Sequence, residues 1–485
     1  MSRLIVGPFN RVEGDLEVTL ELDAGRVSSA RVNAPMYRGF EQILQGKDPH
    51  DALVYVPRIC GICSVSQSVA CARALASLSG ITPPPNGQHV TNVMLATENL
   101  ADHLTHFYLF FMPDFTRAVY AQQPWHSEAV QRFAAQTGEQ TRAAIAARQR
   151  WFTLLGTLAG KWPHTQSIEP GGSTRSVDLA ERIRLLARVR EFRGFLERHL
   201  FSAPLEQISA LDRESALWAW HAQDPWRGDF RLFLSMVQDV ALTGLGPGPG
   251  RYLSFGAYPQ PQGGFEFGSG VWHAGTAALL PLDERGIRED ATYAWLNDAS
   301  GPRHPVDGIT LPDANKAGAY TWNKAPRLAG EVIETGAIAR QLASGNLLVL
   351  DAVGRHGGTV YTRVLARLLE LARVVPMVEN WLQQLQPNEA YCVPTPVVAD
   401  GVGVGLSEAA RGSLGHWVVA DRGRIANYQI VAPTTWNFSP RDAAGTPGAL
   451  EQALVGAPVQ EGEITPVAVQ HIVRSFDPCM VCTVH

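Results

Sequence analysis

The sequence has 485 residues and a mass of 52.8 kDa, and 45% of its residues are hydrophobic while 18% are charged. This composition excludes an intrinsically disordered protein, and the length is enough to bury one large core or two of ordinary size. The formal net charge of −5 and the isoelectric point of about 6.3 exclude a chain-wide basic excess of the kind that binds nucleic acid or an anionic membrane.

The sequence also gives no sign of export or membrane insertion. No apolar run reaches the roughly 20 residues of a membrane span, and residues 1–10 lack the basic and then apolar pattern of a secretory signal. Six cysteines are too few for a disulfide framework in a chain of this length. We therefore expect a cytoplasmic protein with no membrane span and no nucleic-acid partner.

Two β-hairpins are predicted, one near each end of the chain. In an N-terminal region of about 1–35, residues 16–22 alternate between apolar and polar side chains, 23–25 supply a turn, and 26–32 match as a second strand. The second hairpin covers 412–432 and turns at 421–423.

Most of the remaining chain has the composition of helices. Alanine, leucine, arginine and glutamate dominate long segments with few helix breakers, namely 50–79, 90–111, 127–158, 177–200 and 361–385. In the first of these we expect the helix to begin near the cysteines at 60 and 63 and to end at the Pro-rich cluster of 83–87.

The segment of about 241–326 differs, because glycine, proline and aromatic residues are frequent in it. We expect loops and short strands there rather than a flexible linker, since Trp272, Trp295 and Trp322 need packing partners. The whole pattern predicts a single domain over 1–485 that is mainly α with small peripheral β-sheets, an α+β fold around a helical core.

Four of the six cysteines form two Cys-x-x-Cys pairs. Cys60 and Cys63 lie near the start, and Cys479 and Cys482 lie 419 residues later in the C-terminal segment 471–485. Two such pairs can supply four sulfur ligands to one metal site.

Other readings of these pairs remain open at this point. Structural zinc is the alternative that spacing alone favours, but zinc-binding pairs usually lie within a few dozen residues of each other. A thioredoxin-like redox pair at Cys60 and Cys63 would need a βαβ unit that the sequence does not predict. Cys71 and Cys392 match no motif and are expected to be buried small hydrophobic residues.

The two cysteine segments, 58–63 and 477–485, resemble the paired signatures of the large, catalytic subunit of [NiFe] hydrogenases. Further segments resemble this family in the same order along the chain: 11–14, 102–108, 160–164, 170–172, 411–416 and 433–437. The resemblance therefore covers almost the full length. It implies the large helical-bundle core of that family.

The resemblance implies a buried Ni–Fe(CO)(CN)2 centre that splits H2. Cys60 and Cys479 would be terminal nickel ligands, while Cys63 and Cys482 would bridge nickel to an iron that carries one carbon monoxide and two cyanides. Soft thiolates suit both metals. Iron–sulfur clusters would lie in a partner small subunit, because two remaining cysteines cannot hold a cluster. The region 160–172 would contact that subunit.

Further residues take roles by the same resemblance. Glu13 would relay the proton from the Cys479 sulfur, although a surface carboxylate is the ordinary alternative for a glutamate. Arg411 would overhang the open face of the metals, with Asp102 and Asp477 as its carboxylate partners. In addition, Thr434 and the backbone of Pro433 would face a cyanide.

The last residue, His485, would bind Mg²⁺. Its partners by resemblance are Glu41 and the backbone carbonyl of Ile430, with waters completing the octahedron. A frayed terminus is the alternative for His485.

Departures from the family point to one of its branches. Beside the cofactor, Gln67 stands where most members have histidine, and it cannot become cationic near pH 7. Asp15 stands where histidine is common, and the tail that most members lose in maturation is not seen after His485. Gln67 and the missing tail resemble the regulatory, H2-sensing branch, whose members turn over slowly and report through the small subunit to a histidine kinase.

Two side chains suggest oxygen tolerance. Ile62 and Phe110 are bulkier than the valine and leucine usual in oxygen-sensitive relatives, and they would narrow the gas route. Ordinary core packing explains them equally well.

The prediction is thus the large subunit of a regulatory [NiFe] hydrogenase. An energy-conserving uptake hydrogenase with the same site is the alternative. A non-catalytic scaffold like the quinone-site subunit of respiratory complex I is a rival from another class, but that subunit lacks the ligand cysteines that this chain retains.

Overall fold

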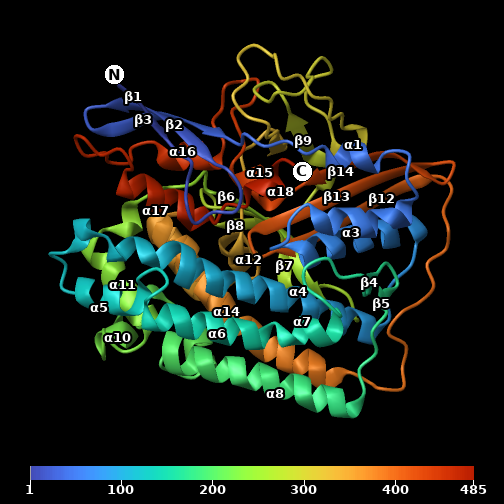
Figure 1. Cartoon of the computed structure of the whole chain (residues 1–485), viewed down its shortest axis with the longest axis horizontal. Coiled ribbons are helices and arrows are strands. Elements are labelled where there is room, and N and C mark those ends of the chain that lie inside the picture. The colour runs from blue at the N-terminus through green and yellow to red at the C-terminus, as the bar shows by residue number, and fades with distance from the viewer. Residues whose placement is uncertain (1) are drawn as a thin grey trace.

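The computed structural model describes residues 2–485, in which the long helices fill the lower half of the view and most of the small sheets lie above them (Figure 1). Helices α4, α6, α8 and α14 pack on one another. The α-helices, in chain order, are α1 (Phe40–Leu44), α2 (Ala52–Tyr55), α3 (Ser64–Ser79), α4 (Pro85–Thr105), α5 (His126–Phe133), α6 (Glu139–Trp151), α7 (Thr153–Leu158), α8 (Leu179–Phe195), α9 (Leu205–Ser209), α10 (Glu214–Ala222), α11 (Asp229–Asp239), α12 (Ala337–Ala343), α13 (Leu347–His356), α14 (Val360–Gln384), α15 (Pro433–Asn437), α16 (Ala449–Leu454), α17 (Val467–Phe476) and α18 (Met480–Thr483).

The strands form small sheets, with orders β1-β2-β3, β12-β13-β14, β11-β6-β7-β8, β10-β9 and β4-β5. Their bounds are β1 (Ser2–Val6), β2 (Glu17–Asp23), β3 (Arg26–Asn33), β4 (Ile168–Glu169), β5 (Gly172–Ser173), β6 (Arg251–Pro259), β7 (Phe265–His273), β8 (Ala278–Leu280), β9 (Ile287–Asp290), β10 (Ala325–Leu328), β11 (Glu334–Thr335), β12 (Gly401–Ala409), β13 (Gly412–Asp421) and β14 (Arg424–Val431). The predicted α+β fold is confirmed, as are both hairpins, β2–β3 and β13–β14.

The segment 127–158 is helical as predicted, but it is divided into three helices, α5, α6 and α7. The first break falls between Phe133 and Glu139, where Gln136 has a left-handed backbone with φ of 67°. Helical composition did not reveal this turn. Elsewhere the long predicted helices hold, and π-helical turns at His106–Phe111 and Leu196–Leu200 extend α4 and α8.

Strand β12 was not predicted, because its glycines gave no strand pattern. A Cβ atom at Gly403 would lie 2.2 Å from the carbonyl oxygen of Ala74, and one at Gly405 would lie 2.0 Å from that of Ala70. Both carbonyls belong to α3. Helix α3 therefore packs directly on the backbone of β12, and only glycine permits this close approach.

The segment of about 241–326 contains the expected loops and the short strands β8 and β9, but β6 and β7 have nine residues each and are longer than expected. Its tryptophans do have packing partners: Trp272 is buried, and the ring centroids of Trp295 and Trp322 lie 5.5 Å apart.

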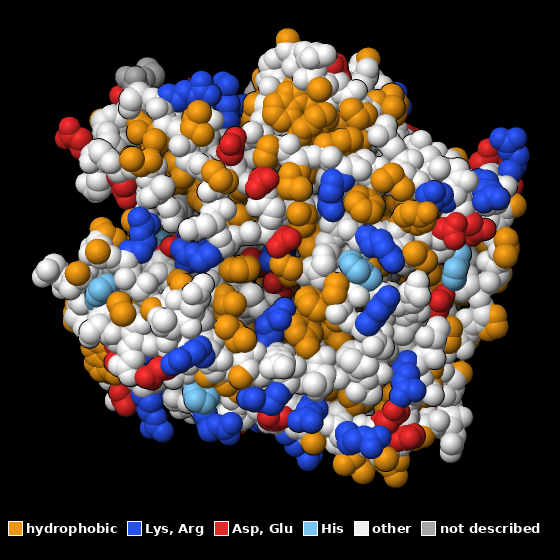
Figure 2. Space-filling view, viewed as in Figure 1, with side chains coloured by type: hydrophobic (Ala, Val, Ile, Leu, Met, Phe, Trp, Pro, Cys, Tyr) orange, Lys and Arg blue, Asp and Glu red, His pale blue; other side chains and the backbone are white. Residues whose placement is uncertain are grey.

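No helix in residues 2–485 combines the length and the apolar character needed to cross a bilayer. On the face drawn in Figure 2, acidic and basic side chains are interspersed with hydrophobic ones.

The two ends of the chain meet in the interior. Glu13 forms an isolated parallel β-bridge with Cys479, and the N–H of Met480 donates to the Glu13 carbonyl at 2.7 Å. The last residue, His485, is buried, and Figure 1 shows the C-terminus in the middle of the molecule beside α15 and α18. This meeting of distant segments positions the candidate site.

Candidate metal centre

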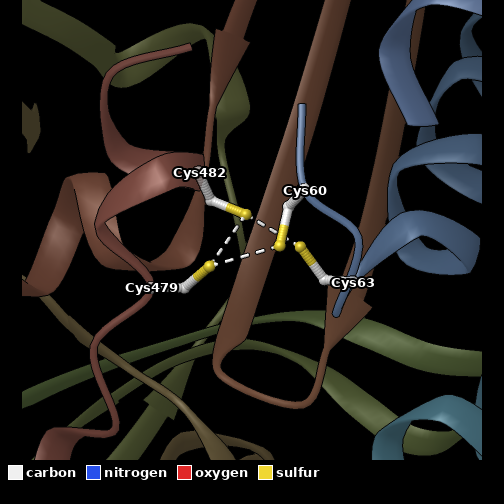
Figure 3. Close-up of side chains that lie close together, drawn as sticks. All are labelled: Cys60, Cys63, Cys479 and Cys482. Atoms are coloured by element: carbon white, nitrogen blue, oxygen red, sulfur yellow. Dashed lines mark hydrogen bonds between the residues drawn. The ribbon is translucent and has the colours of Figure 1, made fainter. Parts of the chain in front are cut away.

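Four cysteine side chains converge in the interior (Figure 3). The Sγ atoms of Cys60, Cys63, Cys479 and Cys482 all lie within 4.8 Å of one another, and all four side chains are buried. The Sγ–Sγ distances are 3.4 Å between Cys60 and Cys479, 2.8 Å between Cys63 and Cys482, and 3.3 Å between Cys479 and Cys482. The structure thus brings both predicted pairs together as one group able to bind metal.

The first pair is held by a buried carboxylate on α4. Cys63 immediately precedes α3, and Glu98 accepts hydrogen bonds from the first N–H groups of that helix, those of Val65 and Ser66, each at 2.8 Å. A carboxylate at a helix N-terminus pairs N–H groups that have no intrahelical partner. Trp162 also donates to Glu98, at 3.0 Å, and burial raises the pKa of Glu98 to about 7.

The second pair is held through its backbone. Helix α17 ends at Phe476 and is followed by Asp477, whose left-handed φ of 58° turns the chain toward Cys479. The N–H of Cys479 donates to the Thr434 hydroxyl oxygen at 3.1 Å, which leaves the hydroxyl proton of Thr434 free to donate elsewhere. Together with the bond from Met480 to the Glu13 carbonyl, this contact fixes the start of α18.

The four thiols cannot all ionise without a compensating positive charge. Hydrogen bonds from Cys479, then Cys482 and Cys63, hold the pKa of Cys60 well below its ordinary value. The pKa of Cys63 is raised well above its ordinary value, first by its bonds with Cys479 and Cys482, and burial raises that of Cys482. The first ionised sulfur therefore opposes ionisation of the others. Metal cations at this point would remove that conflict, so the donor set fits a metal centre.

Arg411 lies close to this group and is fully paired. Its guanidinium donates to both carboxylate oxygens of Asp102, to Asp477 Oδ1 at 3.1 Å and to the Asp477 carbonyl at 2.8 Å. Burial raises the pKa of Asp102 to about 7 against the opposing effect of Arg411. For Asp477, burial acts in the same direction, but Arg411 and His106 hold its pKa below the usual value. The expected partners are therefore in place around Arg411.

Comparison with known proteins agrees with this site. Residues 38–152 and 142–485 match the model of the nickel-dependent hydrogenase family. The chain belongs to this family. It is 28% identical to the hydrogenase-2 large chain of Escherichia coli (strain K12), with 100% of this chain and 97% of that protein covered. It is 29% identical to the periplasmic [NiFeSe] hydrogenase large subunit of Desulfomicrobium baculatum, over 100% and 95% of the two chains.

The fold is also similar to solved hydrogenases. The Ni-Fe-Se hydrogenase from D. vulgaris Hildenborough in the reduced state superposes with a TM-score of 0.85 at 28% identity, and the match covers 100% of both chains. Our chain is accordingly a nickel-dependent hydrogenase, an oxidoreductase, with a cysteine cluster able to bind metal.

In this hydrogenase, the backbone of Glu13 pairs with that of Cys479 and Met480, and the carboxyl group of Glu13 is half-buried. Burial, and then the negative charge of Cys60, raise the pKa of Glu13, while Arg411 and Arg38 oppose the rise. The structure places Glu13 beside the second cysteine segment, and its role as a relay stays a prediction.

Gln67 packs against a histidine that the sequence analysis did not single out. Its Oε1 accepts from His416 Nε2 at 2.8 Å, and the other ring nitrogen of His416 lies 2.8 Å from the Tyr428 hydroxyl. Burial lowers the pKa of His416 to about 3, so both members of the Gln67–His416 pair are neutral. The only sequence signal for His416 is that it ends the segment 411–416, which resembles the family.

Glu41 and His485 also meet, as expected. Glu41 Oε1 lies 3.1 Å from His485 Nε2 and accepts from the N–H of Ile430 at 2.9 Å, whereas the expected contribution of Ile430 was its carbonyl. Lys324, which was not predicted from the sequence, has its ammonium 3.3 Å from Glu41 and 3.2 Å from Glu289. No local pattern marks this lysine, because its partners are distant in sequence.

The remaining predicted residues lie near the cysteine segments. Pro433 begins α15, directly before Thr434, and its carbonyl accepts from Thr335 at 3.5 Å. Ile62 is partly buried between the two cysteines of the first pair, and Phe110 lies on the π-helical turn with its carbonyl bonded to Arg11 at 3.0 Å. A role of Ile62 and Phe110 in gas access stays a prediction.

Replacing Glu98 should disturb the metal centre. Glu98→Ala leaves the N–H groups of Val65 and Ser66 and the indole of Trp162 without their acceptor, which should lower the free energy of unfolding by about 2–4 kcal/mol. Because these groups fix the helix after Cys63, the nickel content of the purified protein should also fall.

Glu451→Ala is the matched control. Glu451 is an equally buried carboxylate that accepts from the N–H of Val32 at 3.0 Å and from the Tyr320 hydroxyl at 2.8 Å. Its loss should reduce stability by a similar amount and leave the nickel content per folded protein unchanged. A wild-type nickel content in Glu98→Ala would show that Glu98 does not position Cys63.

Proposed function

We propose that this hydrogenase is the large subunit of an enzyme that splits H2 heterolytically at a Ni–Fe(CO)(CN)2 centre. Cys60 and Cys479 would be terminal nickel ligands, with Cys63 and Cys482 bridging nickel and iron. The observation that carries the proposal is the buried four-sulfur group made by both ends of the chain, with cysteine at all four positions. When bound, the centre would supply the Lewis acid that polarises H2.

The neighbouring groups suit such a centre. Arg411 keeps a fixed positive charge beside the sulfurs, because Asp102 and Asp477 both pair with it. Thr434 has a free hydroxyl proton that could be donated to a cyanide, and the Pro433 backbone would lie beside the same ligand. These contacts support a centre with anionic ligands.

Infrared spectroscopy combined with metal analysis tests the proposal. The purified heterodimer should contain nickel and iron in the large subunit, and it should show one carbonyl and two cyanide bands that change under H2. Zinc as the only metal, or a spectrum without these bands, would refute the Ni–Fe centre.

We propose a small subunit with iron–sulfur clusters as the electron acceptor. The two cysteines outside the centre are unsuited to hold a cluster, because Cys71 is buried with a pKa raised to about 12 and Cys392 lies elsewhere in the fold. The region 160–172 is proposed as the contact surface because it lies beside the first cysteine pair: the His164 ring lies 3.0 Å from the Pro57 carbonyl, and the His164 backbone N–H donates to the Ser64 hydroxyl at 3.3 Å.

Glu13 is proposed to carry protons from the centre. Glu13→Gln keeps the size of the side chain and the backbone bond to Met480, so the metal content and infrared bands should stay as in the wild type. The exchange of D2 with solvent protons should fall by about 100-fold or more, as expected for loss of a positioned proton-transfer group. Glu17→Gln, on the nearby strand β2, is the control and should exchange normally. Normal exchange in Glu13→Gln would exclude the relay.

We further propose the regulatory role, in which the heterodimer signals H2 to a histidine kinase. Its support is Gln67, which forms a neutral pair with His416 where most family members have histidine. An uptake role is the alternative, favoured by relatives such as the uptake hydrogenase large subunit of Afipia carboxidovorans (26% identical, covering 100% of this chain and 95% of that protein).

Deleting the gene separates these two roles. A sensor should show slow turnover with a redox dye, and its deletion should abolish H2-dependent transcription. Fast sustained turnover together with unchanged transcription would establish the uptake role instead.

Ile62 and Phe110 are proposed to slow the entry of O2. Replacing them with Val and Leu should make H2 oxidation sensitive to air while anaerobic activity is kept. Val65→Ala, on the adjoining helix α3, is a control that removes a comparable volume. Full aerobic activity of the double variant would show that Ile62 and Phe110 do not slow the entry of O2.

Two further proposals complete the picture. Glu41 and His485 would bind Mg²⁺ with the Ile430 backbone, which suits a buried carboxylate and imidazole 3.1 Å apart. A cytoplasmic location rests on the sequence pattern alone.

A further inference from the structure

One guanidinium joins the backbones of the two cysteine segments. Arg38 Nη2 donates to the carbonyl oxygen of Ile59, directly before Cys60, at 2.6 Å, and also to the carbonyl oxygen of Val481, directly before Cys482. In residues 2–485, no other side chain from outside the two segments bonds to the backbone on both sides. Arg38 therefore connects parts of the chain that are more than 400 residues apart.

Both carbonyls need a donor that their own helices cannot supply. Ile59 caps the short 3₁₀ helix Val56–Arg58, and Val481 lies in α18, which has only four residues. The last carbonyls of a helix have no intrahelical partner and carry the negative end of its dipole. A cationic donor is the best partner for two such groups at once.

The side chain of Arg38 is held in this position. Its guanidinium carbon lies 5.1 Å from the centre of the Phe40 ring, and Gly39, with φ of 72°, turns the chain into α1. The Nε–H of Arg38 is buried without an acceptor, whereas the carbonyls of Ile59 and Val481 both accept a hydrogen bond from Nη2. This geometry favours a specific bridging role over a solvated surface arginine.

We propose that Arg38 is a positioning residue that sets the distance between the two cysteine segments. By holding the carbonyls next to Cys60 and Cys482, it fixes a sulfur of each pair relative to the other before metal binds. Its positive charge also reduces the cost of collecting ionised sulfurs in a buried place. The consequence for the metals rests on the proposed function, whereas the positioning itself is a property of the chain.

Cross-linking of the metal-free full chain tests the positioning directly. Limited diamide oxidises two thiols to a disulfide and is itself reduced to the hydrazine, and mass spectrometry of the peptides identifies disulfides between the two pairs. In Arg38→Met the rate of these disulfides should fall by about threefold or more, because an intramolecular reaction depends on how its groups are held. Arg38→Lys keeps the charge on a shorter side chain and should give an intermediate rate.

Arg182→Met is the matched control. Arg182 also donates to distant backbone carbonyls, including that of Leu385 at 2.9 Å, but it joins α8 to the end of α14. Its loss should leave the cross-linking rate unchanged. Thermal unfolding of each variant shows whether it is folded.

The loaded heterodimer gives a second readout. In Arg38→Met the carbonyl and cyanide bands should shift or broaden, and Arg38→Lys should restore them in part. A folded Arg38→Met with wild-type cross-linking and bands would overturn the proposal. If Arg38→Met does not fold, a wild-type rate in Arg38→Lys overturns it. A reduced cross-linking rate in a protein whose wild type lacks the bands would instead refute the Ni–Fe centre and leave the positioning intact.

Discussion

The structure depends on enclosing four cysteine sulfurs in one buried pocket. Sulfurs this close resist ionisation, since each negative charge raises the cost of the next in a place from which water is excluded. The chain places the guanidinium of Arg411, paired with Asp102 and Asp477, close to the sulfurs and anchors both cysteine segments through their backbones. Bound cations would neutralise the negative charge of the ionised sulfurs.

The anchors come from many separate elements of the fold. Glu98 is on α4, Thr434 on α15, and the Glu13 carbonyl in the loop after β1. Each contacts a different point of the two cysteine segments. The geometry of the sulfurs is thus a property of the whole molecule, which explains why a centre with so few ligands requires a chain of this length.

The sequence predicted what is local or strongly patterned. Strand alternation predicted the first hairpin, the turn at 421–423 predicted the second, and composition predicted the long helices. Composition did not predict the break around Gln136, whose backbone is left-handed. The cysteine pairs and Arg411 were found because they sit in short recognisable motifs. Their convergence could be expected only from resemblance to a family, since spacing alone equally suits zinc.

The missed residues share a physical reason. Glu98, Lys324, His416 and Arg38 act through partners far away in the sequence, and a lone charged or polar residue in a helix, strand or loop carries no local sign of burial. Their importance arises only when the fold encloses them, where an unpaired charge would be costly. Long-range contacts of buried polar and charged side chains are therefore what the sequence alone did not predict.

The glycines of β12 have a consequence beyond strand assignment. Because α3 rests on bare backbone at Gly403 and Gly405, the helix has no soft side-chain layer beneath it that could absorb a displacement. A methyl group at either position would push the helix away from the strand, and Cys63 directly precedes the first residue of that helix. Two residues without side chains thus limit how far α3 can move relative to β12, and this limit also constrains the position of the Cys63 sulfur in the cysteine cluster.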